Sequence, residues 1–373
     1  TSTMQQESSR RINFSTRKTM MVAQSLYEGV KLPKEGSVGL ITYMRTDSTR
    51  ISLEAQDACL KFIEKDYGKE YLGKKKIAST KKSEKIQDAH ECIRPTDVTK
   101  TPYSIKDSLS KDQFKLYSLI WKRFVASLMA SAIYNTISAD IISNNEVFRV
   151  SGSNMAFDGF LRVYDYNTEK SKELPSLEEN QILKFKDVKK EQHFTNPPPR
   201  YNEASLIKEL EDLGVGRPST YSPTISTLQS RYYVVLEEKK FVPTELGVTV
   251  NEILVENFDD LVDKKFTAQM ENELDEIAAG KKMWKELVRS FYKDLKEDLD
   301  KAYENIEKVE IEDPVTDVIC DKCGRNMVIK MGRYGKFLAC PGFPECRNTK
   351  PLVEKIGVKC PKCEDGEIVV KRS

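Results

Sequence analysis

Several stretches of the chain carry apolar residues at the helical spacing of three or four positions. Residues 15–28 show this spacing and stop just before Gly29, and a second helix is expected to begin near Ser52. Further along, Ser110 and Gln113 form a plausible capping box in front of a strongly apolar helix. The N-terminal part of the chain is therefore predicted to be mainly helical.

Non-helical patterns interrupt these helices. Residues 38–43 form a short apolar run that predicts a buried strand, and the polar segment 44–50 follows it directly. Loosely alternating, β-rich residues fill much of 134–195, including the run 159–164. The prolines at 197–199 predict a stiff linker, because each ring fixes φ and removes a backbone donor. We therefore expect a strand that ends in a polar loop, and later a β-dominated segment closed by a linker.

Helical spacing returns after the linker. A helix is predicted over 202–214, another after Pro218, and a β-hairpin around 232–242. A long helical pattern then covers 267–309, with Gly280 as a break or kink. This part of the chain is predicted to be a second, mainly helical domain.

These patterns predict a multidomain α+β fold. The chain has 373 residues, enough for two to three domains at a usual size of about 150 residues each. We expect a mixed, mainly helical domain that carries Tyr43, a β-dominated connector, a helical domain, a cysteine-rich ribbon and the truncated start of a second ribbon. The predicted boundaries are 1–131, 132–197, 198–313, 314–357 and 358–373.

Composition excludes two classes of protein and leaves open a protein that binds a polyanion. Hydrophobic residues make up 39% and charged residues 32%, and no long apolar run occurs, so neither a membrane-spanning protein nor a disordered chain fits. The net charge is only +2, but residues 320–373 carry twelve Lys and Arg against six Asp and Glu, and residues 74–85 carry six Lys against one Glu. Such segregation favours local basic surfaces for a polyanion, although most lysine runs are simply solvated.

The cysteines give the most specific metal signal. Cys320 and Cys323 form one close pair, and Cys340 and Cys346 form another, which together suit a tetrahedral, structural Zn²⁺ site in a reducing compartment. The intervening Arg333, Tyr334, Lys336 and Phe337 mix cations with aromatic rings, as in proteins that bind single-stranded nucleic acid. A further pair, Cys360 and Cys363, opens a second module whose other two ligands are missing, so no complete second site is expected.

A second constellation follows the predicted strand and consists of Tyr43, Arg45, Asp47 and Ser48. A phenol with a pKa near 10 is a weak nucleophile unless a nearby cation favours the phenolate. Arg45 is placed to do this and also to hold a phosphate oxygen. Composition alone favours the plainer interpretation, a tyrosine at a strand end beside a surface Arg–Asp pair.

Four blocks of sequence change that balance. Residues 40–52 (LITYMRTDSTRIS) closely resemble the active-site segment of type IA DNA topoisomerases, within which the bacterial topoisomerase I group is most similar. Residues 88–96 (DAHECIRPT), 203–208 (EASLIK) and 214–221 (GVGRPSTY) resemble three further family blocks in the same order, with Cys92 in place of a small residue. The tetracysteine ribbon resembles the C-terminal repeats of the family.

The resemblance implies a chemistry for the first block. Tyr43 would attack a phosphodiester of single-stranded DNA, form a 5′-phosphotyrosine link without ATP, and let another strand pass before religation relaxes negative supercoils. Arg45 would position the phosphate and assist ionisation of Tyr43, while Asp47 would orient Arg45. His90 would contact a phosphate or help to orient the site. The DNA-binding residues that it implies are Arg45, Glu91, Arg94, Lys208, Arg217, Ser219, Thr220, Tyr221 and Arg231.

The chain also departs from the family pattern. The acidic domain that holds Mg²⁺ in the family should precede this chain, and nothing here resembles it. We therefore expect a fragment that binds single-stranded DNA but cleaves it poorly or not at all, from a bacterial cytoplasmic enzyme that works at the nucleoid. The alternative is a zinc-ribbon protein that binds single-stranded DNA without catalysis.

Overall fold

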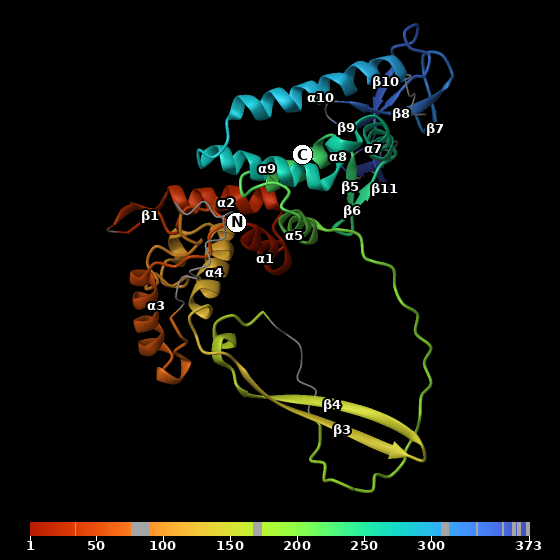
Figure 1. Ribbon diagram of the computed structural model, residues 1–373. Helices are drawn as coiled ribbons and strands as arrows, with labels where there is room; N and C mark the ends of the chain where they lie inside the picture. Colours follow the sequence, from red (N-terminus) through yellow and green to blue (C-terminus); the bar gives the residue numbers. More distant parts are fainter. Residues whose placement is uncertain are drawn as a thin grey trace. The chain divides into compact units, whose positions relative to one another are not determined.

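The computed structural model describes residues 1–33, 35–75, 90–166, 174–306, 313–332, 335–352, 354–359, 363 and 367–370 (Figure 1). The chain divides into two units, Thr1–Glu304 and Asn305–Ser373. Each unit is described by itself. The architecture is the predicted multidomain mixture of helices and small antiparallel sheets.

The first core of the larger unit lies among four helices. They are α1 (Ser2–Ile12), α2 (Thr16–Glu28), α3 (Leu53–Asp66) and α4 (Lys111–Ala126), joined by the short 3-10 turns η1 (Lys69–Tyr71) and η2 (Lys106–Ser108). Leu26, Ile63 and Tyr117 are fully buried in this core. The predicted start of α3 near Ser52 and the predicted capping box of α4 are confirmed: Ser52 accepts from the N–H of Ala55, and Ser110 and Gln113 form the box.

The predicted strand at 38–43 is wrong in most of its length. The structure has the hairpin β1 (Val30–Leu32) and β2 (Gly36–Val38), and residues beyond Val38 run extended with a single bridge, Ile41 to Pro95. The ladder stops at Val38 because its partner β1 begins at Val30, just after α2. At Gly39 the chain passes close to α2, and a Cβ there would lie 2.7 Å from the carbonyl oxygen of Tyr27. The apolar run is buried against the core without forming a regular strand.

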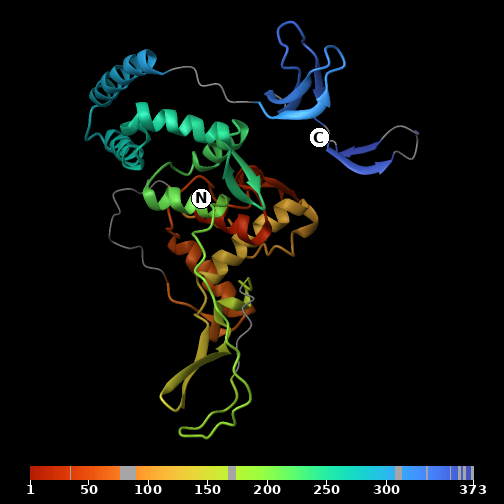
Figure 2. The same cartoon turned by 90° about the vertical axis from the view of Figure 1, so that its right-hand side faces the viewer.

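The connector is a single long hairpin rather than a larger sheet. Strands β3 (Ile133–Ser143) and β4 (Glu146–Phe157) pair only with each other in the described part of the chain (Figure 2). The run 159–164, which was expected to be β-rich, instead begins with the 3-10 turn η3 (Gly159–Arg162). Gly159 has φ +49°, and Val163 and Phe160 pack into the first core, which accounts for their apolar character.

The predicted helical region beyond the linker is confirmed. Its elements are α5 (Glu203–Leu213), α6 (Tyr221–Ser230), β5 (Val234–Glu237), β6 (Lys240–Pro243), α7 (Glu245–Asn257), α8 (Asp259–Val262), α9 (Lys264–Ala278) and α10 (Trp284–Asn305). Its small core contains Ile207, Tyr221, Ile225 and Phe241. Gly280, with φ +72°, lies in the break between α9 and α10 as expected. No helix in the described ranges is long and apolar enough to cross a bilayer.

The smaller unit is built around a four-stranded antiparallel sheet in the order β10, β9, β8, β7. These strands are β7 (Val315–Ile319), β8 (Asn326–Gly332), β9 (Gly335–Ala339) and β10 (Thr349–Pro351), followed by the pair β11 (Glu354–Lys359) and β12 (Glu367–Val370). Met327 and Leu338 are buried beside Cys320 and Cys340. The core of this unit is thus assembled around the cysteines.

Candidate active site and zinc centre

Backbone pairing across fifty residues of sequence places Tyr43. The N–H of Thr42 donates to the carbonyl of Arg94 (2.9 Å), and the N–H of Arg94 donates to Thr42 Oγ1 (2.9 Å). The same hydroxyl donates to the carbonyl of Cys92 (2.7 Å). Thr42 therefore fixes the two motif blocks side by side, and His90 arrives next to Tyr43.

The ring of Tyr43 is half-buried and packs between two other rings. Its centroid lies 4.8 Å from that of His90 and 5.5 Å from that of Tyr27, the latter in an edge-on arrangement. His90 is exposed, so this end of the cluster is open to solvent. The structure therefore brings together two of the four predicted catalytic residues at a place that is open to solvent.

The loop after Tyr43 alternates between buried and exposed positions. Met44, Thr46 and Ser48 are buried, whereas Arg45 and Asp47 are exposed. The chain bends at Met44 and Arg45, and the side chains of Arg45 and Asp47 are open to solvent. No ion pair joins Arg45 to Asp47 within the described residues, and the expected orienting contact between them remains a prediction.

Small polar groups hold this loop from its buried side. The N–H of Thr46 donates to Thr1 Oγ1 (2.9 Å), and the Thr1 hydroxyl donates to the carbonyl of Met44 (2.5 Å). The N–H of Ser48 donates to Thr46 Oγ1 (3.1 Å). The hydroxyls of Thr1 and Thr46 thus satisfy backbone groups of the loop from its buried side, while Arg45 stays exposed.

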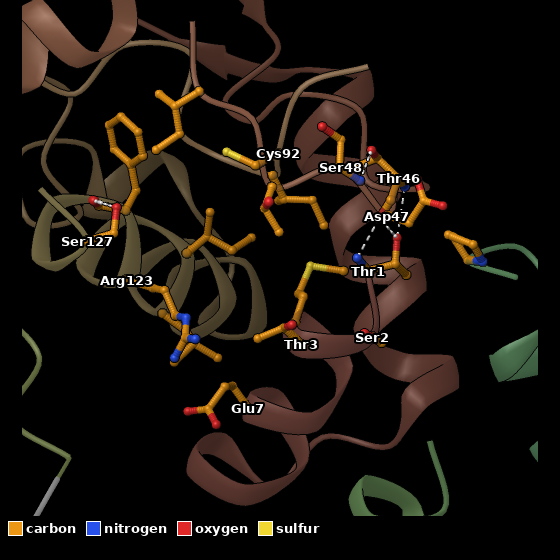
Figure 3. A pocket seen from close by; sticks show the side chains of 18 of the residues that line it. Thr1, Ser2, Thr3, Glu7, Thr46, Asp47, Ser48, Cys92, Arg123 and Ser127 are labelled. Atoms are coloured by element: carbon orange, nitrogen blue, oxygen red, sulfur yellow. Dashed lines mark hydrogen bonds between the residues drawn. The ribbon is translucent and has the colours of Figure 1, made fainter. Parts of the chain in front are cut away.

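A cavity of about 290 Å³ lies behind the loop (Figure 3). Figure 3 shows Asp47 and Ser48 above it, Cys92 beside it, and Arg123 and Glu7 across from the loop. Tyr43 and His90 do not line this cavity. The predicted site is therefore a surface cluster with a cavity behind it, rather than an enclosed pocket.

Glu91 and Arg94, both predicted to contact DNA, are paired with each other. Glu91 Oε2 accepts from Arg94 Nε (2.8 Å) and from the N–H of Ser52 (3.3 Å), and Arg94 Nη1 donates to the carbonyl of Pro95 (3.0 Å). Burial raises the pKa of Glu91, but the hydrogen bonds from Arg94 and Ser52 outweigh it and hold that pKa below its usual value. These contacts suit residues that support the Tyr43 segment.

The predicted DNA-binding residues of the helical region differ in their exposure to solvent and in whether their side chains are already paired. Arg217 pairs with Asp275 (2.8 Å) and Glu271 (3.6 Å) of α9, and Lys208 pairs with Asp212. Tyr221 is buried in its core, and burial raises the pKa of its phenol to about 12. Ser219, Thr220 and Arg231 are exposed, as is the paired Lys208, and Arg231 has no ion pair within the described ranges.

Two glutamates of α5 bind the helices next to the Tyr43 loop, and these contacts were not predicted from the sequence. Glu203 is buried, and its Oε2 accepts from the N–H of Thr16 (2.5 Å) in the first turn of α2. Glu211 accepts from the Ser2 hydroxyl (2.5 Å) and from Gln6 Nε2 (3.3 Å) of α1. A carboxylate at a helix N-terminus satisfies an otherwise unpaired N–H and faces the positive end of the helix dipole. Glu203 belongs to the block at 203–208 that resembles the family, but its partner Thr16 is far away in sequence, so the contact could not be predicted.

Replacing Glu203 by alanine is expected to destabilise the larger unit. The change leaves the buried N–H of Thr16 without an acceptor, which costs about 1–3 kcal/mol, whereas Glu203→Gln keeps an acceptor and should cost less. Urea denaturation measures both. Glu252→Ala, an exposed glutamate on α7, is the matched control. Equal losses in the Glu203 and Glu252 variants would contradict a stabilising contact at α2.

The four predicted zinc ligands converge in the smaller unit. The sulfur atoms of Cys320 and Cys346 lie 3.7 Å apart, those of Cys323 and Cys340 lie 3.2 Å apart, and all four are within 4.8 Å of one another. Tetrahedral zinc with bonds of about 2.3 Å sets its sulfur ligands about 3.8 Å apart. The described residues therefore fit a closed tetrahedral zinc site.

The surroundings of the thiols favour bound metal. Asn348 Nδ2 donates to Cys320 Sγ (3.2 Å), and this hydrogen bond lowers the pKa of that thiol to about 6. The N–H of Gly342 donates to Cys340 Sγ (3.4 Å) and favours its thiolate, but burial and the neighbouring thiols outweigh this and raise the pKa of Cys340 to about 12. Such donors stabilise thiolates and orient them, as the outer contacts of zinc sites do. Thiolates packed this closely need a cation to balance their charge.

Some sequence predictions fall on residues outside the described ranges. These are most of the lysine run, the start of the second block, two ribbon residues and the first cysteine of the second ribbon, namely 76–85, 88–89, Arg333, Tyr334 and Cys360. Of the other ribbon candidates, Phe337 is half-buried in β9.

The mixed fold and the four clustered cysteines of the described residues together define a zinc-binding protein. Residues 1–289 match the DNA topoisomerase family, and residues 317–355 and 357–373 match the topoisomerase DNA binding C4 zinc finger. The chain belongs to the DNA topoisomerase family, which confirms the resemblance found in its motifs. The four clustered cysteines lie within the residues that match this zinc finger, which supports their assignment as zinc ligands.

A solved structure agrees with this assignment. The full-length topoisomerase I from Thermotoga maritima matches with a TM-score of 0.72 and 39% sequence identity over 94% of this chain. The match covers 56% of the Thermotoga chain, so this chain spans little more than half the length of that relative.

Proposed function

We propose that this chain is the strand-cleaving and strand-binding part of a type IA DNA topoisomerase, which relaxes negatively supercoiled DNA by way of a phosphotyrosine intermediate. The observation that carries the proposal is the contact of Tyr43, two residues before the exposed Arg45, with His90, their centroids lying 4.8 Å apart. Family membership supports the reaction class.

The proposed step exchanges one phosphodiester for another. Tyr43 Oη attacks the phosphorus of a single-stranded segment, the phenolic proton passes to water, and the bond from phosphorus to the 3′ oxygen breaks. That oxygen takes up a proton and leaves as a free 3′ hydroxyl, while the 5′ phosphate stays on Tyr43. Because the new ester conserves the energy of the old one, religation by the 3′ hydroxyl needs no ATP.

Each neighbouring group has a distinct part in this proposal. Arg45 holds a phosphate oxygen through its fork of donors and favours the phenolate of Tyr43. His90 packs against the nucleophile and donates to the phosphate. Glu91 and Arg94 brace the backbone that carries both, and the exposed Ser219, Thr220 and Arg231 bind the strand further along.

The described residues hold no fitting site for the Mg²⁺ that is expected for the family. Among the described residues, the tetracysteine set is the one group of three or more candidate ligands within reach of a single ion, and soft thiolates do not suit Mg²⁺. We propose that the acidic Mg²⁺-binding domain lies in the part of the relatives that this chain does not span. The chain alone should then bind single-stranded DNA and cleave it little, as part of a nucleoid enzyme of the bacterial cytoplasm.

The proposal is tested by trapping covalent complexes. The chain, alone and fused to the acidic domain of a family member, is incubated with end-labelled single-stranded DNA and quenched in detergent. Covalent protein–DNA complexes are expected from the fusion with Mg²⁺. Binding without complexes in both samples would favour the alternative, a non-catalytic protein that binds single-stranded DNA.

Arg45→Ala should weaken cleavage far more than binding in the same fusion. Many phosphates are contacted elsewhere, so loss of one should change affinity only a few-fold, while loss of a group aimed at the scissile phosphate should lower the cleavage rate on the order of a hundredfold. Single-turnover cleavage and fluorescence anisotropy measure the two effects. Arg231→Ala is the control, since it should affect binding alone. Equal losses in rate and affinity for Arg45→Ala would make it an ordinary contact.

A further inference from the structure

A second groove in the larger unit has a lining typical of nucleic-acid sites. It has a volume of about 1150 Å³ and is formed by α3, the segment 99–104, α4 and the chain after η3. None of the predicted catalytic or DNA-binding residues lines it. It therefore requires an explanation of its own.

The groove faces away from the cavity behind the Tyr43 loop. Phe114, Ser118 and Lys122 of α4 line the groove, whereas Arg123 and Ser127 of the same helix line the cavity. At about 100° per residue, Ser118 and Arg123 are about 140° apart around the helix axis. The two hollows therefore lie on largely opposite sides of α4.

Cations without acidic partners border the groove. Lys61, Lys65 and Lys115 are exposed, and none of them makes an ion pair within the described part of the chain. Lys122 and Arg162 also line the groove, but they pair with Asp165 and Asp158, respectively. Asp66 is the one acidic residue of the lining. The groove is thus positively charged, with three cations available to a polyanion.

Aromatic rings lie between these cations. Tyr103 is 76% exposed and meets Phe114 edge-on at 5.6 Å. Phe62 and Tyr67 line the same groove and are half-buried. Ser118 Oγ, also in the lining, is buried and has no hydrogen-bond partner among the described residues. A ligand with phosphates, flat rings and polar ring edges could contact the lysines, the aromatic rings and the Ser118 hydroxyl, respectively.

We propose that this groove binds a segment of single-stranded DNA at a site separate from Tyr43. Lysines on the rim neutralise phosphates, and Tyr103 with Phe114 stacks unpaired bases, which are the two interactions that hold single strands on protein surfaces. Duplex DNA buries its base faces in its own stack and cannot use the rings. The proposal depends on the charge and rings of the groove and not on the identity of the nucleophile.

Photo-crosslinking tests the groove directly in the full chain. A Tyr43→Phe background excludes cleavage, and the probe is an oligothymidylate of about ten nucleotides with photoreactive bases. Crosslinks are expected on peptides that contain Tyr103 or Phe114. Tyr103→Ala should lower the yield on those peptides at least about fivefold, because one stacked base is lost. Crosslinks confined to the ribbon and the helical region would overturn the proposal.

Salt dependence provides a second measurement. Replacing Lys61, Lys65 and Lys115 together by glutamine should reduce the slope of log affinity against log salt by about 2, at about 0.7 per lost phosphate contact on a single strand. The control replaces Lys31, Lys239 and Lys293, which are exposed, lie outside the groove and have no ion pair in the described ranges. An equal fall in slope for the control set would refute a specific groove.

Discussion

Removing zinc is expected to unfold the four-stranded sheet of the smaller unit and to leave the Tyr43 region folded. Buried side chains of this sheet are few, chiefly Met327 and Leu338, and the rest of its core is the cysteine cluster itself. Structural zinc contributes roughly 10–16 kcal/mol in small zinc domains, far more than so small a core can supply. The core around Leu26 and Tyr117 shares no residue with the cluster and should not respond.

Hydrogen exchange with and without a strong chelator measures this outcome. Amides of β8 and β9 should then exchange at unfolded rates, while those of α2 and α4 stay protected. Cys323→Ser should reproduce the effect of the chelator, because it removes one of the four ligands. Cys363→Ser is the matched control, since Cys363 is exposed and lies outside the cluster. Protection that survives in β8, or that is lost equally in α4, would contradict a separate zinc-dependent unit.

The helices with clear caps and an apolar stripe were predictable from the sequence, and others were not. The starts of α3 and α4 were predicted because Ser52 and Ser110 satisfy backbone groups locally, without reference to the rest of the fold. Helix α1 was missed because it buries polar residues, Ser2, Gln5 and Ser8 among them, and so shows little apolar periodicity. Tertiary packing, rather than local preference, stabilises that helix.

The candidate active site likewise combines features that local sequence predicts with contacts that depend on the fold. The motif blocks identified Tyr43 and His90, but their contact depends on Thr42 joining segments that are distant in sequence. Some residues predicted to contact DNA form ion pairs within the protein, as Arg217 does with Asp275. These pairs could not be predicted, because the partners are distant in sequence and meet only in the folded chain. The groove along α4 has no motif at all, because its cations and rings come from segments that meet only in three dimensions. Local chemistry can be predicted from the sequence, whereas partners at long range cannot.

Replacing Tyr43 by phenylalanine should abolish the covalent complex in the fusion with the acidic domain. The substitution removes only the oxygen that attacks phosphorus, so the cleavage rate should fall on the order of a thousandfold or more. The ring remains, and with it the packing against Tyr27 and His90. Stability and DNA affinity should therefore change little, which separates loss of chemistry from loss of structure.

Tyr27 makes this test sharp, because it is a second phenol within the same aromatic cluster. Its ring centroid is 5.5 Å from that of Tyr43, and it is partly exposed. Tyr27→Phe should keep the covalent complex, since Arg45 follows Tyr43 by two residues in the chain, whereas Tyr27 lies on α2. Detergent-stable complexes quantified on gels for both variants decide between the two phenols. A complex that persists in Tyr43→Phe and disappears in Tyr27→Phe would move the nucleophile onto α2 and leave Arg45 without its proposed part in ionising it.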